Sequence, residues 1–266
     1  MLELYDTHTH LNSDPFITDI LPYLSRAREA NVKYMNVIGY DLESSARAVD
    51  LALAHEELYA VIGIHPHDAV EWSDEARVKL EALLELGGRK VLAIGEIGLD
   101  YHFSDRHSDS VQAEAFVGQM DLAFAYKLPF VVHCRDAQED CWKLIEAQRQ
   151  KGTLLSTPGV FHCFSGDQAF ANRVLSGGFY LGFDGPITFK NGQESLDIAL
   201  NTPMDRLVLE TDCPYLAPVP KRGKTNEPSY LPFILEKLAE TKDISYEEIS
   251  RITTENAKRL FNLVEQ

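Results

Sequence analysis

The sequence lacks the features that mark exported or membrane-spanning chains. Its 266 residues contain no apolar stretch that approaches the roughly 20 residues needed to cross a bilayer. The opening stretch, MLELYDTH, has neither the basic start nor the apolar run of a signal peptide. We therefore expect a cytoplasmic protein that has no membrane partner.

Cysteine and positive charge are also scarce. The four cysteines show no zinc-finger spacing, and we expect them to be small buried side chains in a reducing compartment. Lysine and arginine number 25 against 41 acidic residues, so the formal net charge is −16. Such a surface repels nucleic acid over most of its area. A nucleic-acid site would need local positive charge, which bound metal ions can supply.

No internal repeat, linker or glycine-rich phosphate loop interrupts the chain. Instead, short apolar runs alternate with longer segments that have helical spacing. Several runs are apolar throughout, as is typical of strands buried on both faces. The spacing predicts strands at 2–6, 33–39, 59–65, 91–98, 129–134, 159–164, 179–184 and 206–212.

Helical patterns lie between these runs and after the last of them. Eight strand–helix units in one chain of this length predict a single (β/α)8 TIM barrel, an α/β fold that forms one domain over 1–266. A doubly wound open sheet is the alternative, weakened by the missing phosphate loop. The expected helices are 19–31, 43–56, 73–86, 110–127, 137–151, 167–176, 192–200, 229–242 and 245–264.

Histidine and carboxylate residues gather where the predicted strands end. The C-terminal ends of the strands form the functional face of a TIM barrel. Imidazole and carboxylate groups are natural ligands for zinc, manganese, cobalt or nickel, and the alternation in THTH places two imidazoles on one side of a strand. The residues concerned are His8, His10, His65, His67, Glu96, His133, His162 and Asp212.

One catalytic ion usually takes about three protein ligands and a water molecule. The six candidates that remain without His65 and His67 are too many for one ion, whereas two ions that share a carboxylate would use them all. A two-ion site activates water and clamps the attacking and leaving oxygens, so hydrolysis is favoured over redox chemistry.

Six short motifs contain these residues: DTHTHL, GIHPH, IGEIGLDY, VVHCRDA, FHCFSG and LETDCPYLAP. Together they resemble the signature of the TatD family of metal-dependent DNases, within the amidohydrolase superfamily. The resemblance covers the whole chain. It implies two divalent ions (Zn, Mn, Mg or Ni), a metal site at the strand ends and exonuclease-type cleavage of DNA.

The resemblance also implies a role for each ligand. His8, His10 and Asp212 would hold one ion, and His133 and His162 would hold the second. Glu96 would bridge the two ions. Asp212 would in addition take a proton from the attacking water, which makes Glu96 and Asp212 the expected catalytic pair.

Further residues near the strand ends are candidates for substrate contact. His65 and Arg135 could bind a phosphate, although Arg135 could instead form an ion pair with Asp136. Tyr101 could stack or hydrogen-bond near the site. Asp6 could orient a metal ligand.

The loop after the last predicted strand, residues 217–231, concentrates positive charge in an otherwise acidic protein. Lys221, Arg222 and Lys224 lie within four positions there. These residues could bind a polyanion, or they could belong to a solvent-exposed loop without a binding role.

Three functions remain open at this point. The first is a DNase that takes strand ends or short single strands into one pocket, with no obligate protein partner. The second is a metal-dependent hydrolase of a small phosphoester, amide or lactone, because one fold hosts many chemistries. The third is a non-catalytic metal-binding protein.

Overall fold

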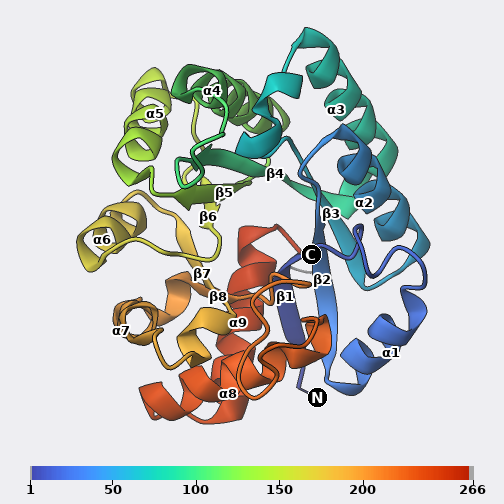
Figure 1. The fold of residues 1–266 in the computed structure, drawn as a ribbon, viewed down its shortest axis with the longest axis vertical. Coiled ribbons are helices and arrows are strands. Elements are labelled where there is room, and N and C mark those ends of the chain that lie inside the picture. Colours follow the sequence, from blue (N-terminus) through green and yellow to red (C-terminus); the bar gives the residue numbers. More distant parts are fainter. Residues whose placement is uncertain (1, 264–266) are drawn as a thin grey trace.

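The computed structural model describes residues 2–263 and shows eight parallel strands arranged around a barrel, each hydrogen-bonded to the next in chain order (Figure 1). A parallel bridge between Thr9 and Cys213 links the two ends of the sheet. The predicted TIM barrel is therefore confirmed. The strands are β1 (Leu4–Thr9), β2 (Val32–Ile38), β3 (Leu58–Ile62), β4 (Val91–Asp100), β5 (Phe130–Arg135), β6 (Gly159–Phe161), β7 (Tyr180–Phe183) and β8 (Leu207–Leu209).

Helices alternate with the strands and surround the barrel (Figure 1). Short 3₁₀ helices occupy several connections: Pro66–Glu71, Gly88–Lys90, Gly185–Thr188, Met204–Arg206 and Pro228–Tyr230. The α-helices are α1 (Leu21–Glu29), α2 (Leu42–Ala54), α3 (Asp74–Gly87), α4 (Asp109–Tyr126), α5 (Gln138–Lys151), α6 (Gln168–Ser176), α7 (Gln193–Asn201), α8 (Leu231–Lys242) and α9 (Tyr246–Leu260).

The predicted bounds were wrong at several strand ends. The first strand continues to Thr9 instead of ending at residue 6, because its last residues pair with the segment after β8. β4 likewise continues to Asp100, while β6 and β8 have only three residues each. The helix predicted over 245–264 ends at Leu260, and residue 264 lies outside the described part of the chain. A single domain over 1–266 stays a prediction.

Two apolar clusters hold the barrel together. The larger one lies between the strands and the surrounding helices. The smaller one contains residues from all eight strands, such as Val61, Val131 and Val208, and it is closed by Leu260 and Phe261 at the end of α9. Because every strand contributes to it, this second cluster fills the barrel interior. In Figure 1, α9 accordingly lies across the centre of the ring.

The described residues include no helix that is long and apolar enough to span a bilayer. All four cysteines are free. Cys141 and Cys213 are buried, as expected, whereas Cys134 and Cys163 are partly exposed.

Candidate metal centre

Closure of the barrel places the end of β1 beside the segment that follows β8. The Asp212 amide donates to the His8 carbonyl at 2.9 Å, and the His10 amide donates to the Cys213 carbonyl at 2.8 Å. This pairing places the Asp212 carboxylate beside both imidazoles. Asp212 Oδ1 lies 3.4 Å from His10 Nε2, and the Nε2 atoms of His8 and His10 lie 3.3 Å apart.

A second group of ligand atoms comes from the middle of the sheet. Gly98 of β4 pairs with His133 of β5 at φ 148°, where a Cβ atom would lie 1.9 Å from the His133 carbonyl oxygen. Only glycine permits so close an approach. Glu96 Oε1 then lies 2.7 Å from His133 Nδ1 and 2.6 Å from His162 Nε2.

The Glu96 carboxylate lies between the two groups. Its Oε1 faces His133 and His162, whereas its Oε2 lies 3.5 Å from His8 Nε2. The structure thus brings all six predicted ligands together and adds His65, whose Nε2 lies 3.8 Å from Glu96 Oε1. Three trios have ligand atoms within 4.8 Å of one another: His8, His10 and Asp212; His8, Glu96 and His162; and His65, Glu96 and His133.

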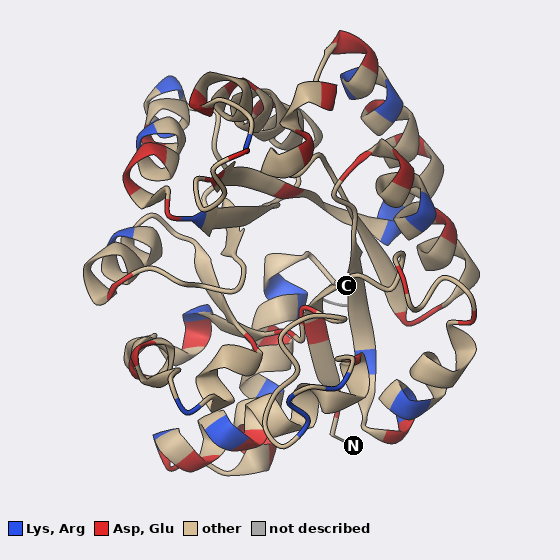
Figure 2. Ribbon diagram, in the orientation of Figure 1, with Lys and Arg blue, Asp and Glu red and all other residues tan. Residues whose placement is uncertain are grey.

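The electrostatics of the cluster suit a cation. Burial lowers the pKa of His8 to about 4, so its imidazole is neutral and has a lone pair to offer. Burial alone would also lower the pKa of His162, but the charges of Glu96, Glu210 and Asp212 outweigh it and raise that pKa to about 10. The buried carboxylates therefore favour positive charge at this place, which a bound metal ion would supply. Figure 2 shows acidic residues on the strands around the barrel centre as well as on the outer helices.

In the imidazoles of His10 and His133, one nitrogen forms a hydrogen bond, which determines that the other nitrogen is available to bind a metal ion. His10 Nδ1 lies 3.3 Å from the Ile38 carbonyl, an acceptor, so Nε2 keeps its lone pair. His133 Nε2 donates to Asp100 Oδ2 at 3.0 Å, which leaves Nδ1 for a cation. Carboxylate–histidine pairs of this kind orient metal ligands in proteins. The residues present fit a metal ion.

Asp100 is the main residue that the sequence reasoning missed. It is buried at the end of β4, and its Oδ2 also lies 3.2 Å from His67 Nε2. The signal was present, because Glu96, Gly98 and Asp100 occupy every second position of one strand. Glu210 was missed in the same way. It is buried two residues before Asp212 and accepts from the Cys163 amide at 2.6 Å.

Asp6 joins β1 to the segment that follows β8 and carries Asp212. Its Oδ1 accepts from the Thr211 amide at 2.9 Å, and its Oδ2 accepts from the Thr211 hydroxyl at 2.6 Å. The same carboxylate lies 3.4 Å from the His8 amide. Asp6 therefore supports the backbone beside His8 and Asp212.

A cavity of about 570 Å³ opens above the cluster. Two of the predicted substrate contacts, His65 and Arg135, line it. Three aromatic residues that were not predicted, Tyr40, Phe103 and Tyr215, line it as well.

The other predicted substrate contacts lie outside the lining of this cavity. Tyr101 is half-buried, and its hydroxyl contacts Asp140 at 3.4 Å. The Lys221 ammonium lies over the ring of Tyr230, 5.1 Å from its centroid. Arg222 covers the ring of Phe189, and Lys224 is likewise absent from the cavity lining. These four residues are not brought together with the metal centre.

Comparisons with known proteins agree with this geometry. The family model described as TatD related DNase matches residues 5–262. This chain belongs to the TatD family. It is 41% identical over 261 residues to the uncharacterized metal-dependent hydrolase YabD of Bacillus subtilis, covering 98% of this chain and 99% of YabD.

Two further TatD-family relatives extend the comparison. The 3′-5′ ssDNA/RNA exonuclease TatD of Cronobacter sakazakii is 37% identical over 265 residues, 97% of each chain. The crystal structure of YjjV, a TatD homologue from Escherichia coli K12, superposes with a TM-score of 0.87 at 31% identity and 98% coverage of both chains. The protein is thus a metal-dependent hydrolase of the TatD family.

Proposed function

We propose that this TatD-family protein binds two divalent cations and hydrolyses phosphodiester bonds at the ends of single-stranded nucleic acid, DNA above all. The observation that carries the proposal is the position of Glu96, whose two oxygens face two different groups of ligand atoms. His8, His10 and Asp212 would hold the first ion, and His133 and His162 would hold the second. Glu96 would serve both ions.

The chain's own residues then have separate tasks. When bound, the ions acidify a water molecule and offset charge on the phosphate. Asp212 accepts the proton of the attacking water; its neighbour His10 holds the pKa of that carboxyl below its usual range despite burial, so the acceptor is ionised at neutral pH. Arg135 and His65 hold the phosphate oxygens from the cavity wall.

The charge of the cavity lining favours a strand end over a duplex. Among the residues that line it, Arg135 is the single lysine or arginine. An acidic protein with one such cation at its site has little to hold a long double-stranded backbone. The exonuclease relative, which is named for single-stranded DNA and RNA, supports the same choice. Contact between substrate and Tyr101, Lys221, Arg222 or Lys224 stays a prediction for longer strands.

The experiment is degradation of end-labelled single-stranded DNA with manganese, magnesium or zinc. We expect stepwise shortening that stops on chelation. A panel of small phosphoesters, amides and lactones is run beside it. The proposal fails if no labelled DNA is shortened with any of the metals, or if a small ester turns over orders of magnitude faster.

A further inference from the structure

Phe103 presents an apolar ring to a polar cavity. It lies in the loop between β4 and α4, is 43% exposed and lines the cavity above the metal centre. It belongs to neither apolar cluster of the described residues. Its ring instead makes edge contacts with His67 and His102, with centroids 5.2 and 5.0 Å apart. This placement leaves part of the ring open toward the substrate space.

A cation lies beside that ring. The guanidinium carbon of Arg135 is 5.4 Å from the Phe103 centroid. Arg135 forms no ion pair with any residue in 2–263, and the neighbouring carboxylate of Asp136 accepts from His102 Nδ1 at 2.8 Å. One wall of the cavity thus offers a positive charge and an aromatic face together. A nucleotide, with its phosphate and its base, matches that pair of groups.

Space continues on the other side of Phe103. A second cavity of about 340 Å³ is lined by His67, Phe103, Asp105, Arg106 and His107. Its volume lies within the range of cavities that hold small ligands. Since His67 and Phe103 line both cavities, they stand between them. A strand with one phosphodiester at the metal centre can therefore run past Phe103.

We propose that Phe103 is the base-stacking residue of this site, holding a nucleobase next to the scissile phosphodiester while Arg135 holds a phosphate oxygen. The inference rests on the proposed nuclease function and adds the means by which a single strand is gripped. Every base has a π face, so stacking of this kind tolerates all sequences. It also gives an acidic protein an affinity for single strands that does not depend on charge.

The test pairs a change in the protein with a change in the substrate. Single-stranded DNA oligonucleotides carry one abasic residue, placed in turn on either side of the terminal phosphodiester. For the wild type we expect kcat/KM to fall by roughly 5- to 150-fold at one of the two placements, the range found for base-stacking aromatics. Phe103→Ala should lose this preference for intact over abasic strands and should cleave both at similar rates.

Matched variants separate stacking from a structural role. Phe103→Trp keeps a π face and should keep the preference, whereas Phe103→Leu keeps apolar bulk and should lose it. Phe124→Ala removes an exposed phenylalanine from α4 and should behave like the wild type.

The inference is overturned if an abasic residue at either placement leaves the wild-type kcat/KM unchanged. It is also overturned if Phe103→Ala still shows the wild-type drop in kcat/KM on the abasic strand. Equal losses on both substrates would indicate a structural role and would overturn it too. If the wild type cleaves no DNA at all, the proposed function itself fails, and the role of Phe103 fails with it.

Discussion

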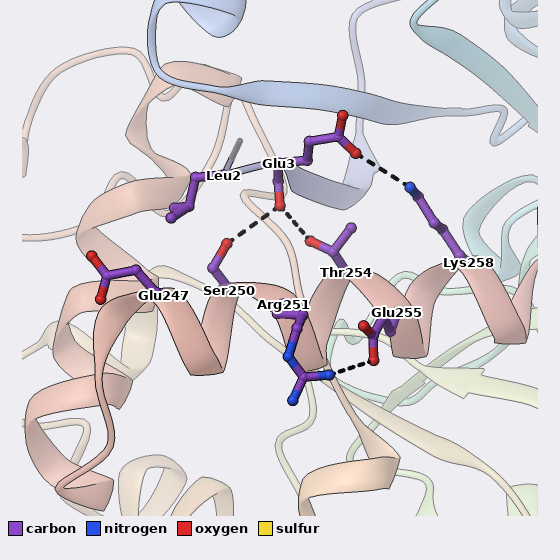
Figure 3. A pocket seen from close by; sticks show the side chains of 8 residues that line it. All are labelled: Leu2, Glu3, Glu247, Ser250, Arg251, Thr254, Glu255 and Lys258. Carbon is purple, nitrogen blue, oxygen red and sulfur yellow. Dashed lines mark hydrogen bonds and ion pairs between the residues drawn. The ribbon is translucent and has the colours of Figure 1, made fainter.

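The two ends of the barrel each carry a hollow of similar size but opposite character. The metal cavity at the C-terminal strand ends measures about 570 Å³, and the N-terminal hollow, lined by Leu2, Glu3 and one face of α9, measures about 550 Å³ (Figure 3). Both contain charged residues. Volume therefore does not distinguish them.

Pairing of the polar groups does distinguish them. In the N-terminal hollow, Lys258 pairs with Glu3 at 3.3 Å and Arg251 pairs with Glu255 at 2.8 Å (Figure 3). The hydroxyls of Ser250 and Thr254 both donate to the Glu3 carbonyl. These groups satisfy one another and need no ligand.

In the metal cavity, by contrast, groups of the same kind are forced together. The Nε2 atoms of His8 and His10 face each other at 3.3 Å, and His133 Nδ1 lies 3.3 Å from His162 Nε2. Two ring nitrogens that both carry lone pairs would repel at such distances, whereas a shared cation would remove the repulsion and would replace the proton that the buried carboxylates favour on His162. Crowding of ligand atoms from several strands, more than concavity, therefore marks the functional end.

The largest expected effect is that of Glu96→Gln. The amide nitrogen that replaces one carboxylate oxygen cannot bind a cation. One of the two groups of ligand atoms therefore loses the oxygen that Glu96 contributes to it. We expect kcat to fall by more than roughly 100-fold, the upper end for residues that only support a ligand. Nuclease rate and bound metal per chain, by elemental analysis, measure this.

Glu255→Gln in the N-terminal hollow is the matched control for Glu96→Gln. It makes the same chemical change in a hollow of the same size and should leave kcat and metal content at wild-type values. A large loss of activity in this control would remove the distinction between the two ends.

Removal of metal is the next largest effect. Ions that bind the folded chain alone stabilise it by about 2.7 kcal/mol at a concentration 100 times Kd. For a chain of this size, chelation should then lower Tm by about 5–10 °C. Thermal unfolding with and without chelator measures the shift, and Glu96→Gln should show a smaller one. An unchanged wild-type Tm would contradict tightly held ions.

Asp100→Asn changes a residue that orients the candidate ligand His133 and leaves all six candidate ligands in place. Its Oδ2 accepts the Nε2 proton of His133, so the variant should weaken the orientation of that ring and its basicity. Loss of such a partner costs roughly 10- to 100-fold in metal affinity or activity. Titration with metal should show the same loss, and added metal should restore part of the rate. A purely structural role would lower Tm without moving the metal titration.

The fold and the gathering of the six candidate ligands could be predicted because both follow from periodic patterns. Eight apolar runs specify the barrel, and the barrel in turn brings Asp212 next to His8, 204 positions away in the chain. The pattern that ends at Asp100 had the same period as THTH and would have revealed that residue. Strand geometry thus carries the information for the whole cluster.

Loop residues could not be placed by such arguments. Lys221 and Arg222 were expected near the site because their loop follows a strand that carries a ligand. In the structure their charges lie over the rings of Tyr230 and Phe189, contacts that no repeat in the sequence encodes. Phe103 was missed for the same reason, since the conformation of its loop sets its direction.

A smaller effect is expected from the ion pair that ties α1 to the loop after β8. Burial would raise the pKa of Glu227, but the hydrogen bonds from Arg26 outweigh it and hold that pKa below the ordinary value of 4.5. The stabilisation is therefore present above pH 4.5 and is lost as the pH falls through the lowered pKa. Glu227→Gln should cost about 1 kcal/mol at pH 7, since Arg26 is partly exposed.

The check for Glu227→Gln is urea unfolding at neutral and at acidic pH. The gap in unfolding free energy between wild type and variant should shrink as the pH falls below 4.5. A gap that stays constant with pH would show that the pair contributes nothing through its charge.

The smallest effect belongs to the paired charges of the N-terminal hollow. Arg251 and Glu255 form an exposed pair one helical turn apart, and such pairs contribute about 0.5 kcal/mol or less. Arg251→Ala should therefore leave Tm within a few degrees and kcat unchanged. Because Glu3 and Lys258 remain paired with each other, the variant also should not create a binding site for anions. A change in nuclease rate would mean that α9, which closes the barrel interior, transmits changes to the metal centre, and the two ends could no longer be treated as independent.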